Sequence, residues 1–458
     1  MRRTRPFFLP FVLLLSACMP IAPSDTPTRA ASLDSSLPAM KTFSVPRPLP
    51  ASRSNSDIAR DFMDLHFQLE SGRQLPRLSR FEGPIAVRVT GNAPAQLDRD
   101  LKRLLHRLRA EAGLDIRQVS ADTPAQVTIE AISSAEIRRA LPMAACFVVP
   151  NVSSIAEYKR KRRSSLLNWA KLEERTSVAI FVPNDTTPQE MRDCLHEELA
   201  QSLGPLNDLY RLSDSVFNDD NVHTVLTGFD MLILRATYDS ALSSGMNRAV
   251  VAARLPGILA RLNPGGEGLG VNRQSRTPRV WIDAVQKALG PGAKHFQRRA
   301  AATEALQVAS AMGWQDHRRA FSHYAMGRIL LITDPDQARA EFEAAGRFYR
   351  MSPSTDLHLA YVASQLGALE LARGRPETTL ALVAPHIDTA ARHENAALLS
   401  TLLLLRAEAL DLTGRVSEAR EVRMDSLGWA RYGFGADWAV RAKLREIASL
   451  SPLKGQRG

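Results

Sequence analysis

The sequence predicts an α+β domain over residues 56–262, followed by an all-α region of helical hairpins over residues 279–450. In the first part, short apolar runs typical of strands alternate with amphipathic helix patterns, which indicates a sheet covered by helices. A segment rich in glycine and proline at 263–278 forms a linker. Beyond it the apolar periodicity is helical almost throughout. The length of 458 residues and the 45% hydrophobic content support two or three folded parts.

The first 18 residues, MRRTRPFFLPFVLLLSAC, predict a lipoprotein signal peptide. Arginines precede an apolar stretch at 7–15 that is too short to span a bilayer. Ser16 and Ala17 then lead into Cys18, which matches the bacterial lipobox. We expect cleavage before Cys18 and lipid attachment to its thiol, with an ordinary cleaved signal as the alternative. The mature protein is then anchored on the periplasmic side of a bacterial membrane, inner or outer.

Residues 19–55 are rich in proline, serine and threonine and predict a flexible tether between the lipid and the folded body. A helix is expected at 57–72. Strand signals follow at 85–89, 127–129, 146–149 and 178–182. Leucines at 97, 101, 104, 105 and 108 form one face of a helix. Further helices are expected at 225–244 and 248–262.

The strand at 178–182 leads into a strong helix start. Thr187 fits an N-cap, Pro188 fits the first turn, and Glu190 fits the last position of a capping box. The helix should run from 188 to about 203, where Gly204 and Pro205 end it.

Three turn segments in the second half are alike: 333–338 (TDPDQA), 373–378 (RGRPET) and 413–418 (TGRVSE). Asp334, Gly374 and Gly414 are 40 residues apart each time. The spacing resembles tetratricopeptide-type helical hairpins with slightly long repeats. Stacked hairpins leave a concave face, so we expect a protein partner to bind there. A plain helical bundle is the alternative.

Two cysteines remain after Cys18, namely Cys146 and Cys194. Outside the cytoplasm such a pair tends to oxidise, and a disulfide between them is expected. Two separate buried thiols are the alternative.

The segment with the most chemistry is 194–208, CLHEELAQSLGPLND. It resembles the active-site helix of zincin metallopeptidases, where two zinc ligands one helical turn apart are followed by a glycine and a third ligand. In the register that keeps the glycine, Glu197 and Gln201 occupy the ligand positions and Glu198 that of the general base. Asn207 or Asp208 then falls on the third ligand position.

In the other register, His196 would pair with Ala200, which cannot bind metal. Zinc prefers imidazole and thiolate, whereas the acid and amide at 197 and 201 suit a hard cation such as calcium, or no metal. We expect no cofactor, with a divalent metal as the open alternative. His223 is a further candidate ligand, although a lone loop histidine rarely serves as one.

The net charge of +11 has one dense basic run, 159–163, with no aromatic residues following it. This favours a solvated basic surface and excludes nucleic acid as the expected partner. Serine and cysteine hydrolases are disfavoured too, because the chain lacks a Gly-x-Ser-x-Gly motif and Cys194 is expected in a disulfide.

The runs 145–150 (ACFVVP), 194–198 (CLHEE), 204–208 (GPLND) and 215–220 (SVFNDD) resemble the proteobacterial family called domain of unknown function 2927. Its members are often predicted lipoproteins and are similar to zincin-like metallopeptidases. The resemblance covers roughly 80–290 and implies a zincin-like, metallopeptidase-like α+β fold without an established activity.

Two functions are therefore weighed. The first is a membrane-anchored envelope lipoprotein whose degenerate zincin-like domain is non-catalytic and binds a protein partner. The alternative is an active metal-dependent peptidase or hydrolase of the cell envelope, with Glu198 as general base and a metal held by Glu197, Gln201 and Asn207 or Asp208. A purely structural envelope lipoprotein is the third reading.

Overall fold

A five-stranded mixed sheet forms the centre of the first domain. The computed structural model describes residues 37–44 and 48–452, so the predicted signal peptide, Cys18 and the first part of the predicted tether lie outside the described residues. The strand order is β2-β1-β3-β5-β4, with β4 antiparallel to β5 and the other pairs parallel. The strands are β1 (Ile85–Gly91), β2 (Ile116–Gln118), β3 (Val127–Ile132), β4 (Phe147–Pro150) and β5 (Val178–Pro183).

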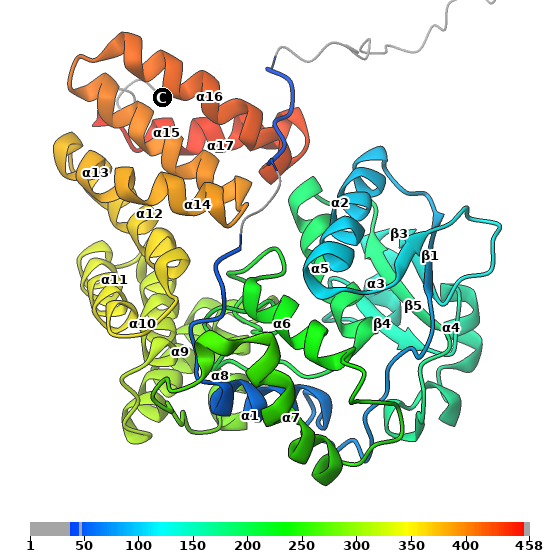
Figure 1. Cartoon of the computed structure of the whole chain (residues 1–458). Coiled ribbons are helices and arrows are strands. Elements are labelled where there is room, and N and C mark those ends of the chain that lie inside the picture. The colour runs from blue at the N-terminus through cyan, green and yellow to red at the C-terminus, as the bar shows by residue number, and fades with distance from the viewer. Residues whose placement is uncertain (1–36, 45–47, 453–458) are drawn as a thin grey trace, which may run out of the picture. The chain divides into compact units, whose positions relative to one another are not determined.

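Helices cover both faces of this sheet (Figure 1). On one face, the leucines of α2 (Ala95–Ala112) pack with α5 (Pro188–Leu203), α6 (Gly228–Thr237) and the inward residues of β1, β3 and β5. On the other face, α3 (Ser134–Ala140) and the start of α4 (Ile155–Lys161) cover Phe147 and Phe181. Every residue of β5 is buried as a result, which explains its continuous apolar run. Two further helices, α1 (Asn55–His66) and α7 (Arg248–Leu262), pack against each other.

The four predicted strands and the helix at 188–203 are confirmed, whereas β2 was not predicted because three residues give too short a pattern. The N-cap prediction is also confirmed, since the Thr187 side chain accepts a hydrogen bond from the Glu190 amide at 3.1 Å. The capping-box prediction was wrong in its second half. The Glu190 carboxylate accepts a hydrogen bond from the Thr186 hydroxyl instead.

The rest of the described chain is helical. Successive helices pair as α8 with α9, α10 with α11, α12 with α13, and α15 with α16. Their bounds are α8 (Arg279–Leu289), α9 (His295–Ala311), α10 (His317–Leu330), α11 (Pro335–Arg350), α12 (Asp356–Ala372), α13 (Pro376–Val383), α14 (Ile387–Arg392), α15 (Ala396–Leu412), α16 (Val416–Phe434) and α17 (Asp437–Ser449).

The three similar segments are the turns before α11, α13 and α16. Asp334 is the N-cap of α11, and Gly374 and Gly414 have φ angles of 68° and 78°. Glycine adopts this left-handed conformation without the steric cost that a side chain adds, which explains the recurrence at 374 and 414. The middle hairpin is irregular, because Pro385 lies in a short 3₁₀ helix (Ala384–His386) between α13 and α14.

Part of the predicted tether packs on the folded body. The Phe43 ring stacks on Trp429 with centroids 4.5 Å apart, and the Lys41 amide donates to the Gly428 carbonyl at 3.0 Å. Further along, the Ser52 and Ser354 hydroxyls are 3.0 Å apart. These contacts hold the described residues between 37 and 55 against the helical region, where the composition alone predicted a flexible chain. No helix among residues 37–44 and 48–452 is long and apolar enough to cross a bilayer.

Candidate functional site

Helix α5, which carries the predicted site, is almost wholly buried. Its first half is fixed by a disulfide between Cys194 and Cys146, the residue just before β4. The predicted disulfide is therefore confirmed. Its C-terminal end is capped by the buried Arg175, whose guanidinium donates to the carbonyl oxygens of Gln201 and Gly204, both at 2.6 Å. A cation here also opposes the partial negative charge of the helix end.

Gly204 lets the chain turn tightly after α5. A Cβ atom at this position would lie 2.9 Å from His66 Nε2 and from a Thr237 methyl carbon. Only glycine fits without displacing these buried side chains. The turn carries the chain to Asn207 and Asp208, as the motif predicted.

The predicted site residues divide into two groups. Glu197, Glu198 and Asp208 lie near the carboxyl group of Glu70, which acts on the ionisation of all three, and Asp219 also acts on Glu197 and Asp208. Gln201 is buried, and Asn207 donates its amide to the Asp64 carbonyl at 2.9 Å. The Asn207 side chain is thus bound to the backbone of α1.

No ion pair among the described residues includes Glu197, Glu198 or Asp208 of this carboxyl cluster, whereas burial raises and Arg279 lowers the pKa values of the outer carboxyl groups Glu70 and Asp219. Burial raises the pKa of Glu197 to about 8, and the nearby Asp219 and Glu70 carboxyls contribute. Burial and neighbouring carboxyl groups also raise the pKa values of Glu198 and Asp208 well above their usual range. Glu198 is 6% exposed, and its Oε2 atom has no hydrogen-bond partner among the described residues.

Asp208 lines a hollow of about 260 Å³ together with Glu70, Arg276 and Arg279. The Asp208 and Glu70 carboxyls are hydrogen-bonded to each other, which requires a proton on one of them. Shared protons of this kind are how neighbouring buried carboxyl groups avoid carrying two negative charges.

These residues do not fit zinc. The donor set consists of carboxylate and amide oxygens without an imidazole, whereas catalytic zinc sites use histidine with carboxylate or thiolate. Within the described part of the chain, no group of three or more His, Cys, Asp or Glu side chains is arranged to hold a metal ion.

His196 has a structural role. Its Nδ1 atom accepts a hydrogen bond from the Leu226 amide at 3.1 Å, and burial lowers its pKa well below the usual value. The ring is consequently neutral, with the Nδ1 lone pair occupied.

The loop after the motif, residues 208–227, lies against the helical region; we call it the motif loop. Tyr210 belongs to the core formed by Trp281 and α8–α12, and Val222 to the core formed by α12 and α15. The His317 ring is hydrogen-bonded to the Tyr210 carbonyl at 2.7 Å, and His358 Nε2 lies 2.9 Å from the Asp220 carboxylate. The side chains of the motif loop thus join the two halves of the chain.

His223, a candidate ligand, lies in a group of histidines. Its ring centroid is 5.9 Å from that of His358 and 5.3 Å from that of His393, and its Nε2 is hydrogen-bonded to the Ser213 carbonyl. No sequence signal could have found this group, because its members come from the motif loop and from segments more than 100 residues later.

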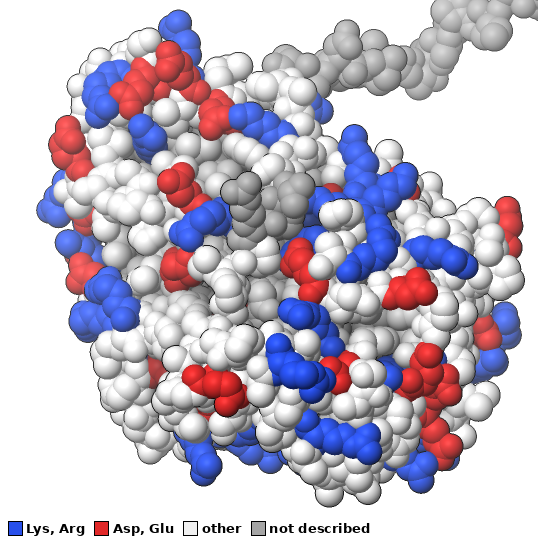
Figure 2. Space-filling model, in the orientation of Figure 1, with Lys and Arg blue, Asp and Glu red and all other residues white. Residues whose placement is uncertain are grey.

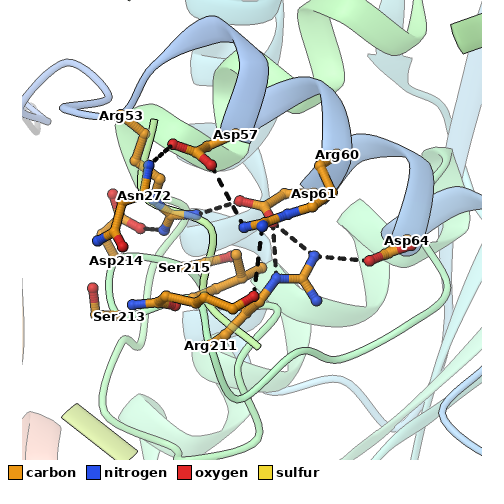
Figure 3. A network of polar contacts seen from close by, with 12 residues as sticks. Arg53, Asp57, Arg60, Asp61, Asp64, Arg211, Ser213, Asp214, Ser215 and Asn272 are labelled. Atoms are coloured by element: carbon orange, nitrogen blue, oxygen red, sulfur yellow. Dashed lines mark hydrogen bonds and ion pairs between the residues drawn. The ribbon is translucent and has the colours of Figure 1, made fainter. Parts of the chain in front are cut away.

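A second polar network was missed although the sequence carried a signal for it. Asp57, Asp61 and Asp64 lie on one face of α1 at helical spacing. Figure 3 shows these carboxylates meeting arginine side chains from the segment before α1, from α1 itself and from the motif loop. The ion pairs are Arg53 with Asp61 and Asp214, Arg60 with Asp57 and Asp61, and Arg211 with Asp61 and Asp64.

This network differs from the carboxyl cluster of α5 in its charge balance. Asp61, only 2% exposed, is within ion-pair distance of guanidinium groups on three sides. A buried charge that is fully paired stabilises a particular arrangement of the chain and is not available to a ligand. The compensated network is therefore structural, whereas the uncompensated carboxyl cluster remains the candidate site.

The molecular surface carries mixed charge. Figure 2 shows basic and acidic side chains interspersed over the visible face, with basic residues gathered over α2. Arg99, Lys102 and Arg109 are the exposed basic residues of that helix. A mixture of both signs is typical of an ordinary solvated surface.

No curated protein and no solved structure matches the chain. The family model described as "Protein of unknown function (DUF2927)" matches residues 55–257. This span begins at α1, contains the whole sheet and α5, and ends within α7. The first domain of the chain, residues 55–257, therefore belongs to the DUF2927 family.

Proposed function

We propose that this protein is a lipid-anchored protein of the bacterial cell envelope whose zincin-like domain is non-catalytic and serves to bind a protein partner. One observation carries the proposal. The buried side chains of Gln189 and Arg192, on the helix that corresponds to the zinc-binding helix of a zincin, bind other parts of this chain.

Arg192 gives the clearest example. Its buried guanidinium donates to the Glu394 carbonyl at 2.8 Å and to the Thr224 hydroxyl at 3.0 Å. Gln189, one turn earlier, binds the side chain of Asn395 and the amide of Ala397. The helix thus holds the helical region against the sheet. This arrangement supports a scaffold role for the first domain. The scaffold would hold the tetratricopeptide-like helical hairpins in place for a protein partner to bind.

One feature favours the alternative of a hydrolase. Glu198 keeps a buried oxygen without a partner and has a raised pKa, as a general acid or base would. The donors around it, however, are carboxylate and amide oxygens without an imidazole, and this set does not fit the zinc ion that polarises the substrate in a zincin.

Hydrolysis assays decide between the two functions. The native protein is incubated with a peptide library and with peptidoglycan peptides, beside the Glu198→Gln variant. We expect no cleavage by either. Cleavage by the native protein that the variant lacks would establish the hydrolase instead.

The anchor is tested separately in cells. Replacing Cys18 by Ala should move the protein from the membrane to the soluble periplasmic fraction. A variant that stays with the membrane would contradict lipid anchoring at Cys18.

A further inference from the structure

We propose that the hollow between the motif loop and helices α8, α10, α11 and α12 is a binding site for a small organic carboxylate with an apolar body. The inference rests on the proposed binding function and names the chemical group of the ligand, a carboxylate. The hollow has a volume of about 190 Å³. Its lining includes Asp220, Phe321, Tyr324, Arg328, Tyr349 and His358.

The walls are mainly aromatic. Phe321 and Tyr324 lie on one helix, with ring centroids 6.4 Å apart and nearly parallel planes. The ring centroid of Tyr349 on α11 lies 4.9 Å from that of His358 on α12. Flat apolar rings of this kind favour an aromatic or aliphatic group of a ligand, because both faces of such a group are buried from water when it binds.

One cation is available to a ligand here. Arg328 is exposed on α10, and none of the described carboxylates forms an ion pair with it; its neighbour is the Tyr324 hydroxyl. The acidic residue of the hollow, Asp220, already accepts hydrogen bonds from His358, Asn218 and the Val222 amide. Arg328 is therefore the charged group of the hollow that is left for a ligand, and guanidinium groups bind carboxylates with two parallel hydrogen bonds.

A second polar group is left unused. His358 is 1% exposed, and its Nδ1 atom has no hydrogen-bond partner among the described residues. Because Nε2 donates to the Asp220 carboxylate, Nδ1 is the ring nitrogen that is left for a ligand. A buried polar atom without a partner costs free energy, and a polar group of the ligand, such as an amide, would satisfy it. An acylated amino acid offers all three features: a carboxylate, an adjacent N–H and an apolar side chain.

Calorimetric titration at pH 7 with N-acetylphenylalanine tests the site, beside the primary amide of the same compound. We expect the acid to bind at least about tenfold more tightly than the amide, because the amide lacks the charge that pairs with Arg328. Arg328→Gln should abolish this preference, whereas Arg299→Gln, which changes an exposed arginine of α9 away from the hollow, should keep it. Equal binding of acid and amide, or no binding of the acid at millimolar concentration, would overturn the proposal.

The natural source of the carboxylate is distinguished with a peptide of three glycines and a C-terminal phenylalanine. Tighter binding of the peptide than of N-acetylphenylalanine assigns the site to peptide C-termini, and tighter binding of the single residue assigns it to free small molecules. Mass spectrometry of the titrated peptide distinguishes a failure of the proposed carboxylate site from a failure of the proposed non-catalytic function. Peptide cleavage would contradict the non-catalytic function and leave the carboxylate site standing, whereas failure to bind contradicts only the site.

Discussion

His358 Nε2 donates a hydrogen bond to the Asp220 carboxylate at 2.9 Å, although 138 residues separate them. Their side chains are only 1% and 3% exposed. Asp220 belongs to the motif loop of the DUF2927 domain, and His358 belongs to α12 of the helical region. The pair is one of the contacts through which the two halves of the chain share a buried surface.

Replacing Asp220 by Asn should loosen this junction. The substitution keeps the shape of the side chain but removes the charge that three hydrogen bonds share. We expect a loss of about 2 kcal/mol in the free energy of unfolding and faster hydrogen exchange in residues 208–227. Asp283→Asn, which breaks an exposed ion pair with Arg279, should cost less than about 0.5 kcal/mol. Similar losses for the two variants would contradict a special role of Asp220.

Acid should destabilise the protein through its buried histidines. Burial lowers the pKa of His66 and of His223 to about 3 and that of His317 to about 4. These values lie below the unfolded value of about 6.5, so the unfolded chain binds more protons. The stability they provide is complete above pH 6.5 and is lost as the pH falls towards 4.

Urea unfolding at pH 7.0, 6.0 and 5.0 measures this effect. Each such histidine should contribute up to about 1.4 kcal/mol per pH unit below 6.5. His317→Gln should reduce the slope by about one proton, and His106→Gln, at an exposed position of α2, should leave it unchanged. A slope unaffected by His317→Gln would show that this ring is not buried as a neutral group.

Glu197 should have the opposite pH dependence. Its pKa of about 8 lies above the unfolded value of 4.5, so the stability it contributes at low pH is lost as the pH rises through 8. Glu197→Gln should therefore raise the free energy of unfolding at pH 9 by up to about 5 kcal/mol relative to the native protein and change it by less than about 1 kcal/mol at pH 5. The exposed Glu421→Gln is the matched control. Destabilisation by Glu197→Gln at pH 9 would indicate that a bound cation keeps the carboxylate ionised.

The disulfide should contribute strongly to stability. Cys146 and Cys194 are 48 residues apart, and closing a loop of this size restricts the unfolded chain by about 4 kcal/mol in the entropic model. The double variant with serine at both positions should lose a comparable amount in urea unfolding. A loss below about 1 kcal/mol would show that the unfolded chain is already compact in this region.

Much of the fold could be predicted because local patterns determine it. The alternating residues of β1, the leucines of α2 and the Thr187-Pro188 start of α5 each specify their element without distant contacts. The 40-residue spacing of Asp334, Gly374 and Gly414 likewise placed the turns before α11, α13 and α16. Strand β2 was not predicted, because its pairing with β1 defines it more than its own sequence does.

The environment of the site could be predicted only in part. The motif identified Glu197, Glu198 and Asp208, which the fold does bring near one another. It could not show that Glu70 and Asp219 join them, since Glu70 follows α1 far away in the sequence. Nor could it show that Arg192 and Asp220 bind residues of the helical region, because such contacts depend on tertiary packing and leave no periodicity in the sequence.

The central claim is that α5 does not carry a catalytic metal, and elemental mass spectrometry of the purified native protein tests it most directly. We expect far less than one zinc or other transition metal per chain, with no difference between the native protein and Glu197→Gln. About one metal ion per chain that disappears in Glu197→Gln would contradict it and would establish a metal centre on this helix.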